Sequence, residues 1–248
     1  MPMNSRVNKV ARVDAAFWLA KIAATTLGET AGDLLSMTLN LGYATSTVVL
    51  ALLLSVALGA QLHARTFRPG LFWGVVLLTS TAGTTLADFV DRSLGFGYAL
   101  SAVGLSILLA TTLLLWWAAE GHIDVSHVRS TRQQLFYWAA ITVSNTLGTA
   151  LGDYLADDSG LGFAGGALLI GSLLAAVVCA WRVTKLERVG LFWIAFVLTR
   201  PFGATFGDFL NKPIAQGGLA LGTVGASAIL AVLLVLAVRL PARAGSRP

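Results

Sequence analysis

The sequence predicts an all-α membrane protein of eight transmembrane helices, arranged as four parallel repeats of two helices each. Three observations support this fold class: a composition that is 56% hydrophobic and only 12% charged, a series of long apolar segments, and a motif that recurs four times. Soluble domains carry about 25% charged residues, so the composition indicates an integral membrane protein.

Eight apolar segments each approach the roughly 20 residues that a helix needs to cross the hydrocarbon core of a bilayer. These segments are Ala15–Ser36, Gly42–Leu62, Gly70–Val90, Gly97–Trp117, Leu135–Leu155, Gly162–Arg182, Gly190–Leu210 and Gly217–Arg239. They leave little chain for a soluble domain. We also expect no cleavable signal peptide, because no short apolar stretch with a small-residue cleavage site opens the sequence.

The positions of the basic residues predict the topology. Of 17 Lys and Arg residues, 13 lie in the two tails and in alternate connections, whereas the remaining connections hold only Arg92 and Lys212. By the positive-inside rule the first group is cytoplasmic, and with it both termini. This distribution follows a membrane topology and argues against nucleic acid as a partner.

One motif occurs in each predicted pair of helices. An aromatic pair ends in Trp; an Asp follows fifteen residues later, with Gly five residues before that Asp and another Gly nine residues after it. The four copies contain Trp18, Trp73, Trp138 and Trp193; Asp33, Asp88, Asp153 and Asp208; Gly28, Gly83, Gly148 and Gly203; and Gly42, Gly97, Gly162 and Gly217. Since every repeat has two helices, all four start on the cytoplasmic side and are related by an axis along the membrane normal.

The Asp residues are 55, 65 and 55 positions apart, so ten extra residues separate two similar halves. The predicted organisation is a cytoplasmic tail (1–14), repeat one (15–66), repeat two (67–119), a cytoplasmic linker (120–134), repeat three (135–186), repeat four (187–239) and a second tail (240–248).

This pattern resembles a bacterial membrane-protein family of four tandem repeats of unknown function, each with two membrane helices, a recurrent Trp and a Gly-Asp motif. The string "FWLAKIAATTLGETAGDLL" in repeat one is the most similar part, and the resemblance covers nearly the whole chain. It implies the fold, the topology and a multi-pass location in the bacterial inner membrane. It implies no activity, so function must be predicted from the residues.

The first helix of each repeat carries a stripe of small residues that precedes the Asp. The stripe consists of Gly28 and Gly32, Gly83 and Ala87, Gly148 and Gly152, and Gly203 and Gly207. Small residues spaced four apart let helices approach closely in lipid. Because each Asp borders this stripe, we expect it to lie at a helix contact.

Positions four, seven and eight before each Asp share its helix face. In repeats one to three all of these residues are polar, including Thr26, Glu29, Thr84, Thr149 and Asn145, whereas repeat four has Ala204, Pro201 and Arg200. An inward-facing polar stripe ending at a carboxylate is therefore predicted. The alternative is a structural Asp that caps the helix or makes a turn, with the four Trp residues anchoring the opposite membrane interface.

Three charged residues break the repeat symmetry. Glu29, Lys21 and Arg200 have apolar or neutral counterparts at most equivalent positions. Arg200 lies about one turn from the level of Glu29, so we expect these two to form an ion pair. Lys21 is three residues from Trp18, and its simplest role is to extend to the cytoplasmic interface.

The carboxylates predict a function in cation transport. Glu29, Asp33, Asp88, Asp153 and Asp208, together with hydroxyl and amide oxygens, make an oxygen-rich set that suits Mg²⁺, Ca²⁺ or Mn²⁺. The acidic-Gly-Asp motif is also similar to motifs of bacterial manganese and calcium exporters. We expect a secondary transporter or channel for a small cation, most simply a divalent metal such as manganese, with Glu29 as candidate proton carrier. No enzyme activity and no cofactor besides the transported ion are expected.

Two other functions remain open. The protein could be a membrane scaffold or accessory subunit, whose Gly and Asp residues only hold the bundle together, or a carrier of a small organic cation bound by aromatic rings. Two further patterns are discounted. His122, Asp124 and His127 have metal-binding spacing but lie in an expected solvated linker, and a catalytic Asp pair is disfavoured because the Asp recurs four times.

Overall fold

A computed structural model describes residues 9–239, apart from the side chain of His127, and within them the chain is entirely helical without a strand. The long helices are α1 (Ala15–Asp33), α2 (Tyr43–His63), α3 (Pro69–Asp88), α4 (Tyr98–Glu120), α5 (Thr131–Asp153), α6 (Gly162–Val183), α7 (Arg188–Asn211) and α8 (Gly222–Arg239). The all-α prediction is confirmed. Most of the first predicted tail and all of the second lie outside the described residues.

Short helical turns follow most of the odd-numbered helices. The π-helical turns η1 (Leu34–Thr38), η2 (Phe89–Ser93) and η4 (Tyr154–Asp158) continue α1, α3 and α5, while η3 (Val125–His127) and η5 (Ile214–Gln216) are 3₁₀ turns in longer connections. The Gly nine residues after each Asp has a positive φ, between 66° and 83°. Glycine adopts this conformation without a steric penalty, so this part of the motif specifies a turn.

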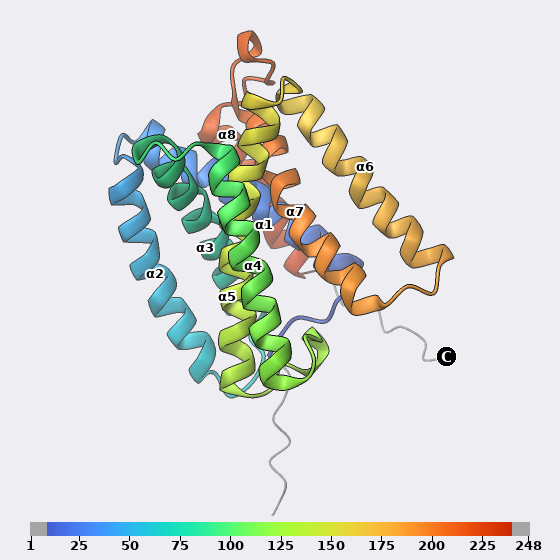
Figure 1. Cartoon of the computed structure of the whole chain (residues 1–248). Helices are drawn as coiled ribbons and strands as arrows, with labels where there is room; N and C mark the ends of the chain where they lie inside the picture. Colours follow the sequence, from blue (N-terminus) through green and yellow to red (C-terminus); the bar gives the residue numbers. More distant parts are fainter. Residues whose placement is uncertain (1–8, 240–248) are drawn as a thin grey trace, which may run out of the picture.

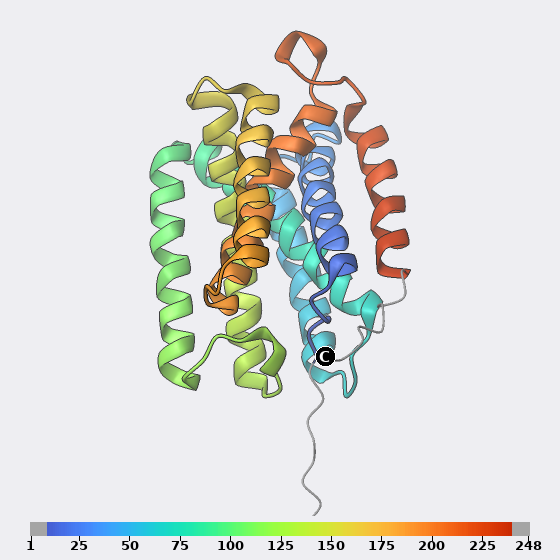
Figure 2. The same ribbon diagram turned by 90° about the vertical axis from the view of Figure 1, so that its right-hand side faces the viewer.

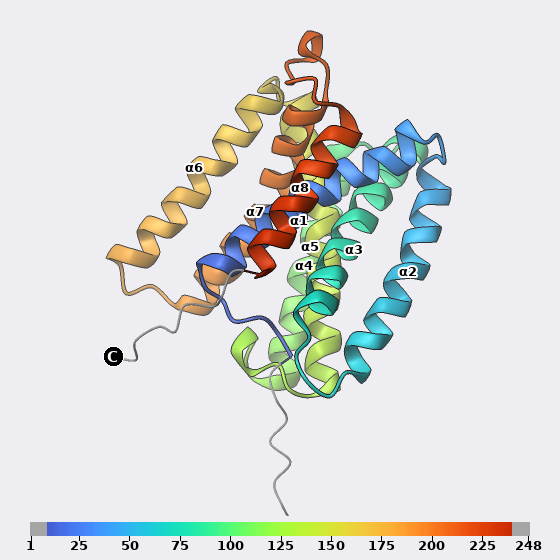
Figure 3. The ribbon, with the colours of Figure 1, turned by 180° about the vertical axis from the view of Figure 1, so that it is seen from behind.

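The odd helices form an inner ring and the even helices cover it (Figure 1). Around the ring, α1 packs on α3, α3 on α5, α5 on α7, and α7 on α1. Each even helix packs on the odd helix of the following repeat: α2 on α3, α4 on α5 and α6 on α7. The last helix, α8, closes the circle by packing along α1 (Figures 2 and 3).

Six helices are long and apolar enough to cross a membrane: α2, α3 with its π turn, α4, α6, α7 and α8. Within the most apolar window of each, 56–67% of residues are buried for α3 and α7, but only 11–22% for the even helices. The exposed even helices are therefore the ones that present apolar side chains outward. In contrast, α1 and α5 carry many polar residues, such as Glu29 and Asn145, and these are buried inside the ring.

Each glycine of the motif allows the backbones of neighbouring odd helices to touch. A Cβ added at Gly28 would lie 3.1 Å from the carbonyl carbon of Ser80, and one at Gly83 would lie 3.1 Å from that of Asn145. The corresponding distances are 3.0 Å from Gly148 to Arg200 and 2.9 Å from Gly203 to Thr25. In every case the partner is the residue eight positions before the next Asp around the ring. The small-residue stripes thus lie at helix contacts.

The Trp residues pack inside the bundle, so their predicted role as interface anchors is wrong for at least three of them. Trp73, Trp138 and Trp193 are 6%, 2% and 4% exposed. In repeats one, two and four the aromatic residue before the Trp packs on the Trp of a neighbouring repeat, with ring centroids 5.5 Å apart for Phe17 and Trp73, 5.5 Å for Phe72 and Trp138, and 5.7 Å for Phe192 and Trp18. Because the odd helices are so close, their first turns bury these rings against one another rather than against lipid.

The central connection also differs from the solvated linker that we expected. Val125 and Val128 are buried in the main hydrophobic core. The indole nitrogen of Trp193 donates a hydrogen bond to the carbonyl of Ile123 at 3.0 Å. These apolar residues anchor the connection against the end of the bundle that carries the aromatic pairs.

The glycine contacts predict that Gly83→Leu will destabilise the fold. Overpacking costs about 1–3 kcal/mol, and here the clash is with backbone atoms of α5, which cannot rotate away. We expect a lower thermal midpoint and less monodisperse protein in detergent. Gly59→Leu is the matched control, because an added Cβ on this α2 glycine meets no atom within 4 Å. Equal stability of the two variants would contradict the close-packing argument.

Candidate functional site

Polar residues of the odd helices meet at three levels inside the ring, and Lys21 forms the first. Its side-chain nitrogen donates to Asn145 Oδ1 at 3.3 Å and lies 4.0 Å above the ring of Phe196. The amide of Asn145 in turn donates to Thr79 Oγ1 at 2.9 Å. The ammonium group of Lys21, on α1, therefore contacts α5 and α7, and Asn145 connects it to α3.

The expectation that Lys21 extends to the membrane interface is wrong, because the residue is only 1% exposed. Both of its contacts, an amide oxygen and an aromatic face, favour a positive charge. Among the described residues no carboxylate lies within ion-pairing distance of it.

Arg200 forms the second level and also contacts every odd helix. Its Nη1 lies 2.9 Å from Glu29 Oε2, so the ion pair expected from the sequence is present. Its Nη2 donates to Thr84 Oγ1 and Thr149 Oγ1, each at 2.5 Å. Thr84 then donates to Glu29 Oε2 at 3.2 Å. One guanidinium group thus joins α7 to α1, α3 and α5.

The sequence around Arg200 explains how so large a side chain fits. Its aliphatic part lies directly against Gly148, where any Cβ would clash. The carboxylate partner is accommodated in the same way, because a Cβ at Gly207 would lie 3.1 Å from the Cβ of Glu29.

The four repeat Asp residues form the third level and are bridged in pairs by two basic side chains. Arg92 lies 2.9 Å from Asp88 and 3.5 Å from Asp153. Lys212 lies 3.1 Å from Asp33 and 3.3 Å from Asp208. Asp33 also accepts a hydrogen bond from Asn211 at 3.1 Å. All four Asp residues are buried.

Lys212 follows the last residue of α7. Burial alone lowers the pKa of Lys212, but the negative charges of Asp208 and Asp33 outweigh this effect and hold the pKa above the ordinary value of a lysine. The two carboxylates therefore favour the charged form of the bridging amine.

At the Asp level, four carboxyl groups share two basic groups. One oxygen from each of Glu29, Asp153 and Asp208 lies within 4.8 Å of the others, so these three residues could hold a metal ion. Asp91, in the same turn as Arg92, is also buried.

The predicted hydroxyl and amide ligands serve other contacts. Thr84 and Thr149 bind Arg200, and Asn145 binds Lys21. Thr26 donates to the carbonyl of Ile22 in its own helix. Of the predicted ligands, the carboxylates are the ones whose charge favours a cation.

Sequence reasoning missed the bridging roles of Arg92 and Lys212. A signal was present, because each lies four residues after an Asp, the spacing of an ion pair on one helix face. Their second partners, Asp153 and Asp33, belong to the following repeat around the ring and could be identified only from the structure.

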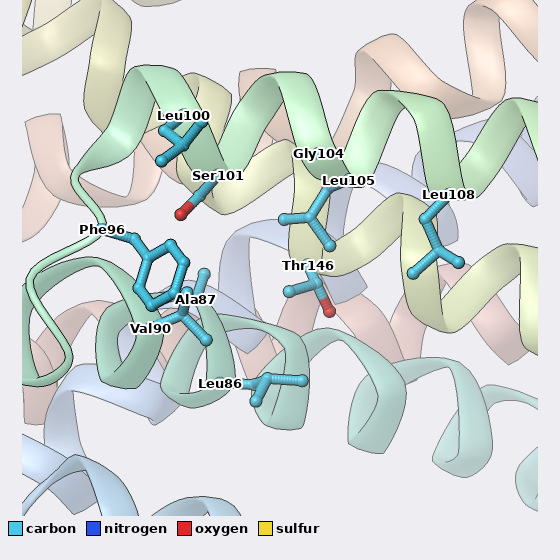
Figure 4. A pocket seen from close by; sticks show the side chains of 10 residues that line it. All are labelled: Leu86, Ala87, Val90, Phe96, Leu100, Ser101, Gly104, Leu105, Leu108 and Thr146. Atoms are coloured by element: carbon cyan, nitrogen blue, oxygen red, sulfur yellow. The ribbon is translucent and has the colours of Figure 1, made fainter.

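A cavity of about 400 Å³ lies between α3 and α4, with Thr146 of α5 also in its lining. Leu86, Val90, Phe96 and Leu105 line it, with Ser101 among the few polar residues (Figure 4). None of the five predicted carboxylates lines this apolar cavity.

The fold and the buried ionisable residues define a class of protein: a four-repeat helical bundle with membrane-type helices and ionisable side chains in its interior. A family model described as Repeat of Unknown Function (DUF347) matches residues 16–67, 71–122, 136–186 and 191–245. The chain belongs to this family, which confirms the resemblance found in the sequence. No curated protein and no solved structure matches the chain.

The Arg200 network predicts strong coupling between Glu29 and Arg200. Removing one partner of a buried ion pair costs about 3–5 kcal/mol, because the other charge is left unpaired. We expect Glu29→Thr or Arg200→Ser alone to lower the thermal midpoint sharply. The double variant, which has the kind of residues found in other repeats, should be much more stable than the sum of the two losses implies. Additive losses in this double-mutant cycle would show that the pair is not coupled.

Proposed function

We propose that this protein is a secondary transporter of a small cation, most simply a hard divalent metal such as manganese. Its eight helices cross the bacterial inner membrane with both termini in the cytoplasm. The observation that carries the proposal is the Asp level, where buried carboxylates outnumber the bridging basic groups by two.

The residual charge favours a divalent ion or two protons. Ionisable residues inside a membrane protein are costly and mark ion or proton pathways. One divalent cation would neutralise the two excess carboxylates, and so would two protons. An exchange of one metal ion for two protons therefore keeps the site neutral on both halves of a transport cycle.

The positive levels favour a carrier over an open channel. Lys21 and Arg200 occupy the interior between the Asp level and the aromatic end of the bundle. The guanidinium group of Arg200 is a fixed positive charge, and fixed positive charges on a pathway are electrostatic barriers to cations. A cation can pass only if these side chains move, and Glu29, which pairs with Arg200, is the candidate to exchange a proton during that movement.

The proposal of eight spans includes α1 and α5 despite their polar sequences. Both lie in the inner ring, where other helices cover their polar faces. Helices in that position need not meet lipid all round, so their hydropathy is not a guide to whether they span.

Transport into proteoliposomes tests the proposal. With a pH gradient, wild-type protein should move at least one of Mn²⁺, Mg²⁺ and Ca²⁺. Asp153→Asn should reduce the rate about tenfold or more, since it removes a ligand charge. Asp33→Asn should do the same. Asp158→Asn is the matched control, because this Asp is exposed.

Glu29→Gln should chiefly change the pH dependence of transport. If folded wild-type protein moves none of the three ions, or if both Asn variants transport normally, the carboxylates are structural and the scaffold function becomes the better explanation.

A further inference from the structure

The two bridging basic residues occupy equivalent positions in alternate repeats. Each lies four residues after the Asp of its own repeat, and each also reaches the Asp of the following repeat around the ring. The same position holds Met37 in repeat one and Asp157 in repeat three. The Asp level is therefore bridged at two opposite interfaces, between repeats two and three and between repeats four and one.

The unbridged interface between repeats three and four is where carboxylates converge. Asp153 and Asp208 belong to these two repeats, and Glu29 approaches them within 4.8 Å. Arg92 forms an ion pair with Asp153, and Lys212 forms one with Asp208. A cation bound between them competes with both basic side chains for the same oxygens.

The basic side chains are more accessible than the carboxylates that they bind. The Arg92 side chain is 32% exposed and that of Lys212 is 17% exposed, against 2–5% for the four Asp side chains. Both residues lie at or beyond a helix end, one in η2 and one directly after α7. They separate the carboxylates from the end of the bundle opposite the aromatic pairs.

Arg92 also contacts a second, more exposed pair of side chains. The carboxylate of Asp157 lies 4.0 Å from its guanidinium group and is 43% exposed. The ring of Tyr98 lies 5.6 Å away, and its hydroxyl donates to Asp157 at 3.3 Å. Arg92 therefore keeps a carboxylate and an aromatic ring as partners at the exposed end if it leaves Asp153.

We propose that Arg92 and Lys212 are tethered counter-cations that hold Asp153 and Asp208 when no metal is bound, and that release these two carboxylates, while keeping Asp88 and Asp33, when a metal binds. This inference rests on the proposed function. The tethers lower the affinity of the site for the metal. A carrier needs this moderate affinity, because a site that binds too tightly cannot release the ion. They also place the metal site at the unbridged interface, with Glu29, Asp153 and Asp208 as its ligands.

Binding of Mn²⁺ to the purified full-length protein in lipid nanodiscs tests the inference, with free Mn²⁺ measured by electron paramagnetic resonance. Arg92→Met and Lys212→Met give these positions the residue found in repeat one. Each should tighten Mn²⁺ binding about tenfold or more, since affinity for such ions follows the charge of the site. Met37→Lys adds a third tether and should weaken binding by a similar factor.

Two controls isolate the tether from the general change in charge. Arg65→Met makes the same substitution at an exposed residue beyond the end of α2 and should leave the affinity unchanged. Arg92→Lys keeps the charge and should bind Mn²⁺ nearly as wild type does. If removal of a tether prevents folding, Met37→Lys still decides the question.

The outcomes separate this inference from the proposed function. If Asp153→Asn abolishes Mn²⁺ binding but the tether variants bind as wild type does, the tether inference alone is wrong. If neither wild type nor any tether variant binds Mn²⁺, both proposals fail. Tighter binding in both Met variants and weaker binding in Met37→Lys would establish the tethers.

Discussion

The close contact between neighbouring odd helices is the constraint on which the rest of the structure depends. Each of the four motif glycines lies against the backbone of the next odd helix. The contact is with the residue eight positions before the repeat Asp of that next helix. Small residues allow such contacts because van der Waals packing drives helix association in lipid. This distance is also short enough for a single guanidinium group to reach all four helices. A larger residue at Gly148 would separate α5 from α7 and remove the space that Arg200 fills.

The chain shows three degrees of symmetry, and each has a different physical role. The glycine contacts follow a fourfold pattern, since packing requirements are the same at every interface. The bridges of Arg92 and Lys212 follow a twofold pattern, in agreement with two similar halves. Glu29, Lys21 and Arg200 have no symmetry at all. A fully symmetric ring would offer several equivalent sites, whereas one Glu and one Arg select a single interface.

Fixed sequence offsets predicted the repeats, the inward-facing polar stripes and the helix contacts, because these depend on periodicity and residue size. The ion pair of Glu29 with Arg200 was predictable as well, since both residues are exceptions within the repeat and lie near one level. The partners of the other charged residues could not be predicted from the sequence. The direction of the Lys21 side chain depends on how helices far apart in the sequence cross. The identity of the second Asp partner of Arg92 depends on the same crossing. The packing of each even helix on the next repeat has the same cause, and so does the burial of the Trp residues.

The order of charges along the bundle makes the carboxylates informative about function. A scaffold needs stable packing, and a buried carboxylate left partly unpaired opposes stability. The chain reduces this cost with two basic residues but does not remove it, although repeats one and three have positions where further basic residues would complete the pairing. Repeat three instead has Asp157 there, which adds negative charge close to Arg92. An incomplete set of counter-charges, bridged from the accessible end and bounded on the other side by Arg200 and Lys21, is the arrangement expected of a site that must accept and release a cation.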